Sequence, residues 1–404
     1  MSGRATGAAE TAATGEAGAA GRPFVPDATR LPAGATGVVV VDLGAIRGNY
    51  LALRSLAGRA ECAAVVKADA YGLGAAKVVP ALNRAGCRTF FVATPDEGAA
   101  ALRLAPGATV YVLDGLIKGA GPAIAAAGVR PVLTGLDEVR EWAALGPPEG
   151  RSPPAALHID TGLHRLGLPA ADLDRLAGEP GLLARLDLRL VISHLAAADE
   201  PLNPMNGMQR QAFLARAAHF PGLPRSLAAS DGLMIGEDFH FDLVRPGYAL
   251  YGGQAMPERP APVVPAVSVH ARILQVADVP AGAPIGYSAT YRTRSRRRIA
   301  TIAAGYADGV FRHLSRASGS QGGEIAIAGR RAPIVGRVSM DLVTADVTDL
   351  PEGLVARGGL AELIGATIGL EEVGGRAGTI GYEVLTRLGR RFHRLYLPDA
   401  NGGG

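Results

Sequence analysis

The sequence predicts an α/β protein with an N-terminal (β/α)8 barrel of the TIM type and a C-terminal domain of mostly β structure. Between residues 37 and 264, eight short apolar runs alternate with amphipathic helical patterns. From residue 265 to 397, strand-like runs separated by glycine and proline turns take their place. Residues 1–36 are rich in alanine and glycine and residues 398–404 in glycine, so we expect a disordered N-terminal tail and a flexible C-terminal tail.

The predicted elements follow one another in a regular order. The first helix begins after Asp42, which is a good N-terminal cap. The barrel strands are expected near 62–66, 89–93, 109–113, 129–133, 155–160, 188–193, 225–229 and 241–244. Helical patterns between them cover 74–84, 95–104, 136–145 and 205–218. The strands of the second domain are expected at 268–276, 298–303, 324–327, 332–338 and 342–347.

Composition excludes several classes of function. The formal net charge of +4 is small for 404 residues and gives no reason to expect binding to nucleic acid or to a membrane surface. Cys62 and Cys87 are too few for a disulfide framework, and their spacing suggests no metal site. The chain starts without the pattern of a secretory signal, and no apolar window reaches the ~18 residues of a membrane span. We therefore expect a cytoplasmic protein without a bound metal.

Lys67 is the first candidate for chemistry. It ends an apolar run that is typical of a buried strand, and Tyr71 and two glycines follow it closely. A lysine at the rim of an apolar strand loses its proton readily and can attack the carbonyl of an aldehyde cofactor. An isolated lysine more often just ends a strand in water, so the assignment depends on the other strand ends.

Those strand ends carry polar residues as well, and active sites of such barrels lie at the carboxyl ends of the strands. The residues there are His158, Arg165, His194, Ser230, Arg245, Gly247 and Tyr248. The phosphate site of such barrels tends to lie by the seventh and eighth strands, where Ser230 offers a hydroxyl and the segment at Gly247 offers backbone N–H groups. A lysine and a phosphate cradle on one rim predict pyridoxal 5'-phosphate.

These residues lie in motifs that resemble alanine racemase, a pyridoxal-phosphate enzyme of fold type III, over nearly the whole chain from about residue 37. The motifs are Val65–Gly72, Asp160–Gly167, Ser193–Asp199, Val244–Tyr248, Gly286–Tyr291, Gly305–Gly309 and Gly336–Asp341. The resemblance implies a homodimer with composite active sites that interconverts L-alanine and D-alanine by a two-base mechanism. It also implies that the product supplies D-alanine for peptidoglycan.

The resemblance implies a role for each residue. Lys67 would hold the cofactor covalently and act as one base, and Tyr287 would act as the other from the partner subunit. Arg245 would donate to the pyridine nitrogen, which leaves the cofactor a weaker electron sink. Arg165 would position the cofactor's phenolic oxygen or the substrate carboxylate, and the backbone N–H of Met340 would touch that carboxylate. Further cofactor-binding residues would be Tyr71, His194, Ser230, Gly247, Tyr248 and Tyr382, and entryway residues would be Tyr306 and Asp341.

Three positions depart from the family pattern. His158 lies where many members have a lysine, often carbamylated, and a histidine cannot carry that anion, so Arg165 must be oriented otherwise, for example by chloride or an acidic neighbour. Leu73 replaces a common histidine and Ser339 a common cysteine. These changes affect fine geometry more than reaction type.

Two alternatives stay open. One is a racemase of the same fold that acts on serine or another amino acid. The sequence does not exclude it, because the volume of the substrate pocket cannot be determined from the sequence. The other is a non-catalytic pyridoxal-phosphate carrier built as a bare barrel. The second domain, with Tyr287 and Met340, argues against a carrier.

Overall fold

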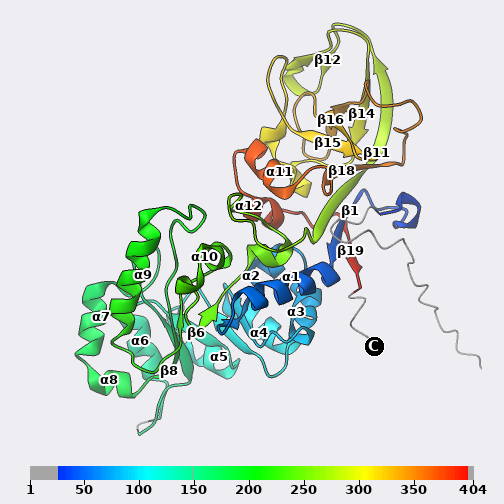
Figure 1. Ribbon diagram of the computed structural model, residues 1–404. Coiled ribbons are helices and arrows are strands. Elements are labelled where there is room, and N and C mark those ends of the chain that lie inside the picture. Colours follow the sequence, from blue (N-terminus) through cyan, green and yellow to red (C-terminus); the bar gives the residue numbers. More distant parts are fainter. Residues whose placement is uncertain (1–25, 148, 399–404) are drawn as a thin grey trace, which may run out of the picture.

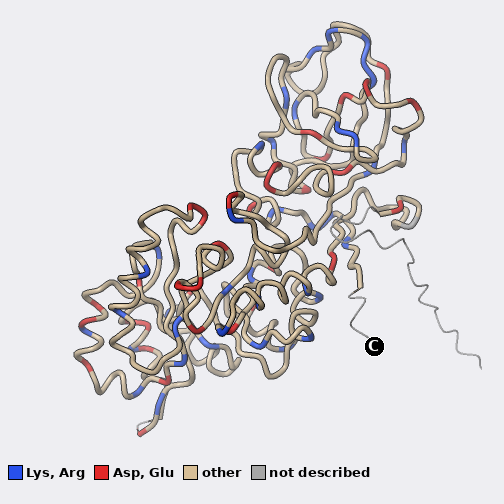
Figure 2. Tube along the Cα trace, in the orientation of Figure 1, with Lys and Arg blue, Asp and Glu red and all other residues tan. Residues whose placement is uncertain are grey.

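The computed structural model describes residues 26–147 and 149–398, which form a domain of β/α units and a domain of mostly antiparallel strands (Figure 1). The sequence predictions for residues 1–25 and 399–404 lie outside the described part of the chain. Within the described residues, no helix is long and apolar enough to cross a membrane. Basic and acidic residues alternate along the chain in both domains (Figure 2), in keeping with the small net charge.

The first domain is a closed parallel barrel. Its strands are β2 (Glu61–Cys62), β3 (Ala64–Val65), β4 (Thr89–Val92), β5 (Thr109–Val112), β6 (Arg130–Leu133), β7 (Pro154–His158), β8 (Asp187–Ile192), β9 (Arg225–Ser226) and β10 (Leu243–Val244). β3 to β9 pair in chain order. β2 and β3 both fall within one predicted strand, 62–66, and only Ala63 separates them. Ala63 N donates to Val244 O of β10 at 3.0 Å, so the pairing with β10 continues across the gap. β10 pairs with β2, and Asp242 N donates to Arg225 O at 3.0 Å, which closes the ring. All eight predicted strands are therefore present.

Helices cover the outside of the barrel (Figure 1). They are α1 (Leu43–Leu56), α3 (Ala75–Arg84), α4 (Pro95–Leu104), α5 (Gly121–Ala126), α6 (Leu136–Ala143), α7 (Ala170–Ala177), α8 (Pro180–Ala184), α9 (Pro204–Ala217) and α10 (Ser230–Ile235). Asp42 caps α1 as predicted, since its Oδ1 accepts from Ala45 N at 2.8 Å. Trp142 of α6 and Phe213 of α9 are fully buried, so the apolar face of each helix packs toward the barrel core.

The second domain is built on β11 (Val267–Val279), a strand of 13 residues. The other strands are β1 (Gly37–Asp42), β12 (Pro284–Ile285), β13 (Tyr291–Arg292), β14 (Arg297–Ile302), β15 (Glu324–Ile327), β16 (Arg330–Pro333), β17 (Val343–Asp346), β18 (Leu360–Ile364) and β19 (His393–Leu397). The five strands expected after residue 265 are present. β12, β13, β18 and β19 were not predicted.

The N-terminal boundary of the barrel was predicted wrongly. β1 falls in the range assigned to the barrel, but it pairs antiparallel with β11 and parallel with β19 in the second domain. Residues 26–36, which we expected to be disordered, contain a short 3₁₀ helix, and Leu31 is buried against β1. Arg272 of β11 fixes this segment by donating to Ala28 O at 3.1 Å and to Ala35 O at 2.8 Å. A composition rich in alanine and glycine gave no sign of these long-range contacts.

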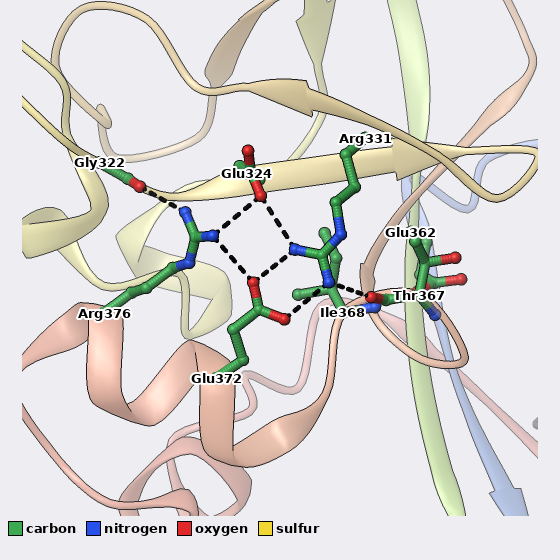
Figure 3. Close-up of polar contacts among 8 residues, drawn as sticks. All are labelled: Gly322, Glu324, Arg331, Glu362, Thr367, Ile368, Glu372 and Arg376. Carbon is green, nitrogen blue, oxygen red and sulfur yellow. Dashed lines mark hydrogen bonds and ion pairs between the residues drawn. The ribbon is translucent and has the colours of Figure 1, made fainter.

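Two helices connect the second domain to the barrel, α11 (Leu370–Ala377) and α12 (Gly381–Thr386). Figure 3 shows how α11 is fixed: Arg331 and Arg376 alternate with Glu324 and Glu372 in a closed ring of ion pairs at 2.5–3.0 Å. The ring attaches α11 to the β15–β16 hairpin. α12 then lies between the domains and contacts the chain just after β3 (Figure 1).

Candidate active site

Residues after five of the barrel strands meet at one rim. Lys67 follows β3, His158 ends β7, His194 follows β8, Ser230 begins α10 after β9, and Arg245 follows β10. Parallel strands place their carboxyl ends on the same side of a barrel, so these residues share one face. Their electrostatic coupling supports this proximity, because charges on Lys67 and Arg245 both lower the pKa of His194.

Lys67 begins an unusual turn, α2 (Lys67–Tyr71). The four residues after it have φ values of 55–56°, in the left-handed region, although none is glycine. Each such residue costs about 1–2 kcal/mol relative to right-handed backbone, so the turn is strained. Hydrogen bonds stabilise it, among them Ala70 N to Val66 O at 2.9 Å and Ala75 N to Asp69 Oδ1 at 2.7 Å.

The second domain also holds this turn. Arg394 of β19 donates to Gly72 O at 2.9 Å, and the hydroxyl of Tyr396 donates to Leu73 O at 2.9 Å. Gly74 has φ 97°, and a Cβ there would lie 2.1 Å from the Tyr396 hydroxyl, so only glycine fits. The position of Lys67 therefore depends on contacts from both domains.

The environment of Lys67 favours a neutral amine. Burial is the largest cause that lowers its pKa, followed by the positive charge of Arg165, while Asp114 and Glu97 oppose them. A lysine whose pKa is lowered by burial has more of the unprotonated form that attacks a carbonyl. The role predicted for Lys67 requires an amine of this kind.

The two histidines of the rim are neutral at neutral pH. Burial, and then the charge of Arg245, lower the pKa of His158 to about 4 and that of His194 to about 3. His158 therefore brings no charge to Arg165. Among the described residues, no carboxylate lies within ion-pair distance of Arg165, which is exposed, so the acidic neighbour suggested above is absent from this chain's described part.

Arg245 is buried, and neutral acceptors surround it. Its guanidinium donates to Ser193 O at 2.6 Å and to Leu227 O at 3.3 Å, and a close contact joins it to the Ser226 hydroxyl. Burial lowers its pKa to about 10, so the group stays charged at neutral pH. Because arginine only donates, it suits an unprotonated ring nitrogen as a partner.

Backbone N–H groups and hydroxyls converge beside strands β9 and β10. The Ser230 hydroxyl accepts from Gly247 N at 3.0 Å and from Ala249 N at 3.2 Å. A Cβ at Gly247 would lie 2.3 Å from the Tyr71 hydroxyl, so the missing side chain makes room for that phenol. The rings of Tyr71 and Tyr382 lie 6.2 Å apart, and burial raises the pKa of both, so both are protonated donors. Such a group of donors fits a phosphate.

The side chain of Tyr248 makes contacts that the sequence did not predict. Its hydroxyl donates to Glu371 Oε1 at 3.0 Å, and its ring stacks on Tyr382 at 3.9 Å. Its hydroxyl is thus directed at a carboxylate of α11, and its ring supports Tyr382. The Tyr382 hydroxyl donates to Asp231 Oδ2 at 3.2 Å.

Gln209 and Phe91 are further supporting residues that sequence reasoning missed. Gln209 of α9 is buried and joins the loops after β7 and β8: its amide donates to His194 O at 2.9 Å and to Thr161 Oγ1 at 3.3 Å, and its oxygen accepts from Ala196 N at 2.8 Å. The ring of Phe91 lies 5.8 Å from the guanidinium of Arg245. A glutamine on the core-facing side of a helix was the only signal for the first, and nothing marked the second.

Besides Tyr382, four predicted residues lie in the second domain: Tyr287, Tyr306, Met340 and Asp341. Tyr287 is 70% exposed and Met340 53% exposed. β12, which ends two residues before Tyr287, lies at the end of its domain farthest from the barrel (Figure 1). Tyr306 lies beside the segment of Met340, since Ala307 N donates to Met340 O at 3.0 Å, and Arg391 binds Asp341 at 2.7 Å. A single chain therefore does not bring Tyr287 to the rim that carries Lys67.

The two domains match two family models. Residues 41–255 match the model described as alanine racemase, N-terminal domain, and residues 266–396 match the model described as alanine racemase, C-terminal domain. The alanine racemase of Brucella abortus is 47% identical over 397 residues, which cover 95% of this chain and 98% of that protein. The alanine racemase of Rhodospirillum rubrum is 46% identical over 92% of this chain and 98% of its own length.

Solved structures agree with this match. A crystal structure of alanine racemase from Bartonella henselae with covalently bound pyridoxal phosphate is 39% identical, with a TM-score of 0.85 over 90% of this chain and all of that chain. Biosynthetic alanine racemase from Pseudomonas aeruginosa is 34% identical, with a TM-score of 0.82 over 90% and 100% of the two chains. By its barrel, its second domain and its similarity along nearly its whole length, this chain belongs to the alanine racemase family.

Proposed function

We propose that Lys67 of this chain holds pyridoxal 5'-phosphate and that Tyr287 of the partner subunit completes the active site. As a member of the alanine racemase family, the chain is a pyridoxal-phosphate-dependent enzyme that interconverts L-alanine and D-alanine. The observation that carries the assignment is the rim itself, where a lysine of lowered pKa, a buried arginine and a group of phosphate donors converge.

The residues of the rim fit the cofactor. Lys67 would bind its aldehyde carbon, Arg245 would donate to its ring nitrogen, and His194 would lie against its ring. Arg165, which is exposed at the rim, would position the cofactor's phenolic oxygen or the substrate carboxylate. The phosphate would be held by Tyr71, Ser230, Gly247, Tyr382 and the backbone of Tyr248.

Racemisation needs a proton to leave one face of the substrate Cα and another to arrive at the opposite face. When bound, the cofactor withdraws electrons from that carbon and makes its proton acidic. The Lys67 amine would exchange the proton on one face and the phenol of Tyr287 on the other. Since Arg245 keeps its own proton, it would leave the ring nitrogen unprotonated and limit side reactions.

A homodimer would bring these groups together. Tyr287, Tyr306, Met340 and Leu342 are large apolar or aromatic side chains, and all four are exposed on the second domain. The segments of Tyr306 and Met340 are hydrogen-bonded to each other, since Tyr306 N donates to Ser339 O at 3.0 Å, and neighbouring exposed apolar side chains support an interface. In a two-fold dimer, each second domain would cover the barrel rim of the other subunit, with Met340 offering its N–H to the substrate and Tyr306 and Asp341 lining the entryway.

The setting would be the cytoplasm, where D-alanine would be supplied for peptidoglycan. Both cysteines of the chain, Cys62 and Cys87, are buried and free, as is common in a reducing compartment. A racemase for serine or another amino acid remains the second candidate, because the same residues would act on its Cα.

Borohydride reduction tests the assignment of Lys67. The purified protein is treated with borohydride, digested, and the modified peptide is mapped by mass spectrometry. We expect the label on Lys67 and no D-alanine formation by Lys67→Ala. A label on Lys77 or Lys118, which also lie in the barrel, would overturn the proposal, and so would a protein with bound cofactor but no racemase activity on alanine or serine.

A further inference from the structure

The first N–H of the turn that begins at Lys67 is bound by a side chain from the neighbouring β/α unit. Ala68 N donates to Glu97 Oε1 at 2.7 Å. Ala68 is the first left-handed residue of the turn, so its N–H marks the point where the backbone leaves the strand. Glu97 is therefore bound directly to the residue that follows Lys67.

Glu97 is itself fixed at the start of α4. Its other oxygen accepts from Thr94 N at 3.4 Å, and its own N–H donates to the Thr94 hydroxyl at 3.4 Å, which together make a capping box. The same oxygen also accepts from Ala93 N at 2.9 Å. A capping box uses one carboxylate oxygen within its own turn. The second oxygen is free to reach another segment, and here it reaches the strained turn after β3.

We propose that Glu97 is a positioning residue for Lys67: it anchors the N-terminal end of the left-handed turn and places a negative charge beside the amine. The inference rests on the role proposed for Lys67. Arg394 and Tyr396 hold the other end of the turn from the second domain, so the lysine segment is fixed at both ends.

The charges that face Lys67 give this proposal a distinct signature. Burial is the largest cause and lowers the pKa of the amine, Arg165 lowers it further, and Asp114 and Glu97 raise it. Removing the Glu97 charge should therefore lower that pKa further. A residue with a merely structural role would not change the pH at which Lys67 reacts.

Glu138 provides a matched control in the same barrel. It occupies the corresponding position of α6, accepts from Thr134 N at 2.8 Å, and reaches the segment after β5 through Leu116 N at 3.2 Å. The two glutamates thus perform the same kind of bridging between neighbouring units. Only Glu97 bridges to the turn that carries Lys67.

The test measures how fast the full-length chain binds pyridoxal 5'-phosphate covalently after its own cofactor has been removed. The absorbance change on covalent attachment gives a rate constant at each pH between 6 and 9. Glu97→Gln keeps the length of the side chain but loses the charge and one acceptor, and Glu138→Gln does the same at the control site. Glu97→Asp keeps the charge but is too short to bridge to Ala68. Lys67→Ala shows whether capture depends on Lys67.

We expect Glu97→Gln and Glu97→Asp to slow capture by about 10-fold or more, because small displacements of a reacting group have large effects on rate. The pH profile of Glu97→Gln should also move to lower pH, while that of Glu97→Asp and Glu138→Gln should match the parent. Parental rates and pH profile for Glu97→Gln, or equal slowing in Glu138→Gln, would overturn the inference. Covalent capture by Lys67→Ala would instead overturn the role of Lys67 itself.

Discussion

Three histidines, His158, His194 and His270, are held neutral by burial, which makes each of them a source of acid sensitivity. His270 is the simplest of them, because it is 3% exposed, donates to or accepts from the Ser268 hydroxyl at 3.1 Å, and has burial as the cause that lowers its pKa to about 4. The unfolded chain binds a proton at the ordinary histidine pKa of about 6.5. Between these two values the unfolded state holds more protons, so stability falls as pH falls from about 6.5 towards 4.

Replacing His270 should reduce this acid sensitivity. We expect His270→Gln to lose about 2 kcal/mol less unfolding free energy than the parent between pH 8 and pH 5, since it removes one group with this shift. Urea unfolding at a series of pH values measures the difference. His313→Gln, at an exposed position of the same domain, is the control and should follow the parent. If His270→Gln shows the parental pH dependence, the buried neutral histidine is not a source of acid instability.

The sequence was enough to predict which residues lie on the rim, but not their protonation states or their contacts. Lys67, His194 and Arg245 were predicted at strand ends, because an apolar run that stops at a polar residue marks such an end. The neutral state of His194 depends on burial beside cations that come from other strands. For the same reason the contact between Tyr248 and Glu371, which are far apart in sequence, had no local signal.

Among the elements, the turn at Lys67 is the one where local preference and structure disagree. The sequence favours an ordinary helical turn over Lys67–Tyr71, because alanine prefers right-handed backbone. The structure instead has left-handed backbone there, held by Glu97, Asp69 and Arg394. Long, periodic elements such as α4 matched their predicted ranges, since the hydrophobic pattern decides them. Backbone conformations that depend on contacts between distant parts of the chain could not be predicted in this way.

Glycine in this turn should stabilise the protein. Ala68 has φ 55° and an exposed side chain, so Ala68→Gly removes strain and loses little packing. We expect an increase in unfolding free energy of about 0.5–1 kcal/mol, because relief of strain exceeds the entropic cost of glycine. Ala76→Gly, at an exposed position in the right-handed helix α3, should instead lose about 1 kcal/mol. Urea unfolding measures the free energy of unfolding of both variants. An equal loss in Ala68→Gly and Ala76→Gly would contradict the left-handed conformation of Ala68.

For the whole molecule, one sheet of the second domain contains strands from both ends of the described chain. β1 and β19 pair with each other, although β1 leads directly into the barrel and β19 ends the second domain. Arg394 and Tyr396 of β19 also bind the turn after Lys67. The second domain therefore supports the lysine of its own subunit, while its exposed residues Tyr287 and Met340 are available to another subunit.

Activity should consequently depend on a dimer with shared sites. Two inactive variants, Lys67→Ala and Tyr287→Ala, are mixed in equal amounts and allowed to exchange subunits. If the bases act across the interface, each mixed dimer has one site with both bases and one site with neither. Activity should recover to about half of the parent's in a mixed dimer and to about a quarter in a random mixture.

A second mixture distinguishes a site shared between two subunits from a site within one subunit. The double variant Lys67→Ala/Tyr287→Ala is combined with the parent, and each site of a mixed dimer then has only one base. Activity should fall from about half of the all-parent value before exchange to about a quarter after it, because only parental dimers remain active. If both bases belonged to one chain, the first mixture would stay inactive and the second would stay at about half. Subunit exchange must be demonstrated in both mixtures, for example by mass spectrometry of the intact dimers, so that a lack of recovery counts against the shared site.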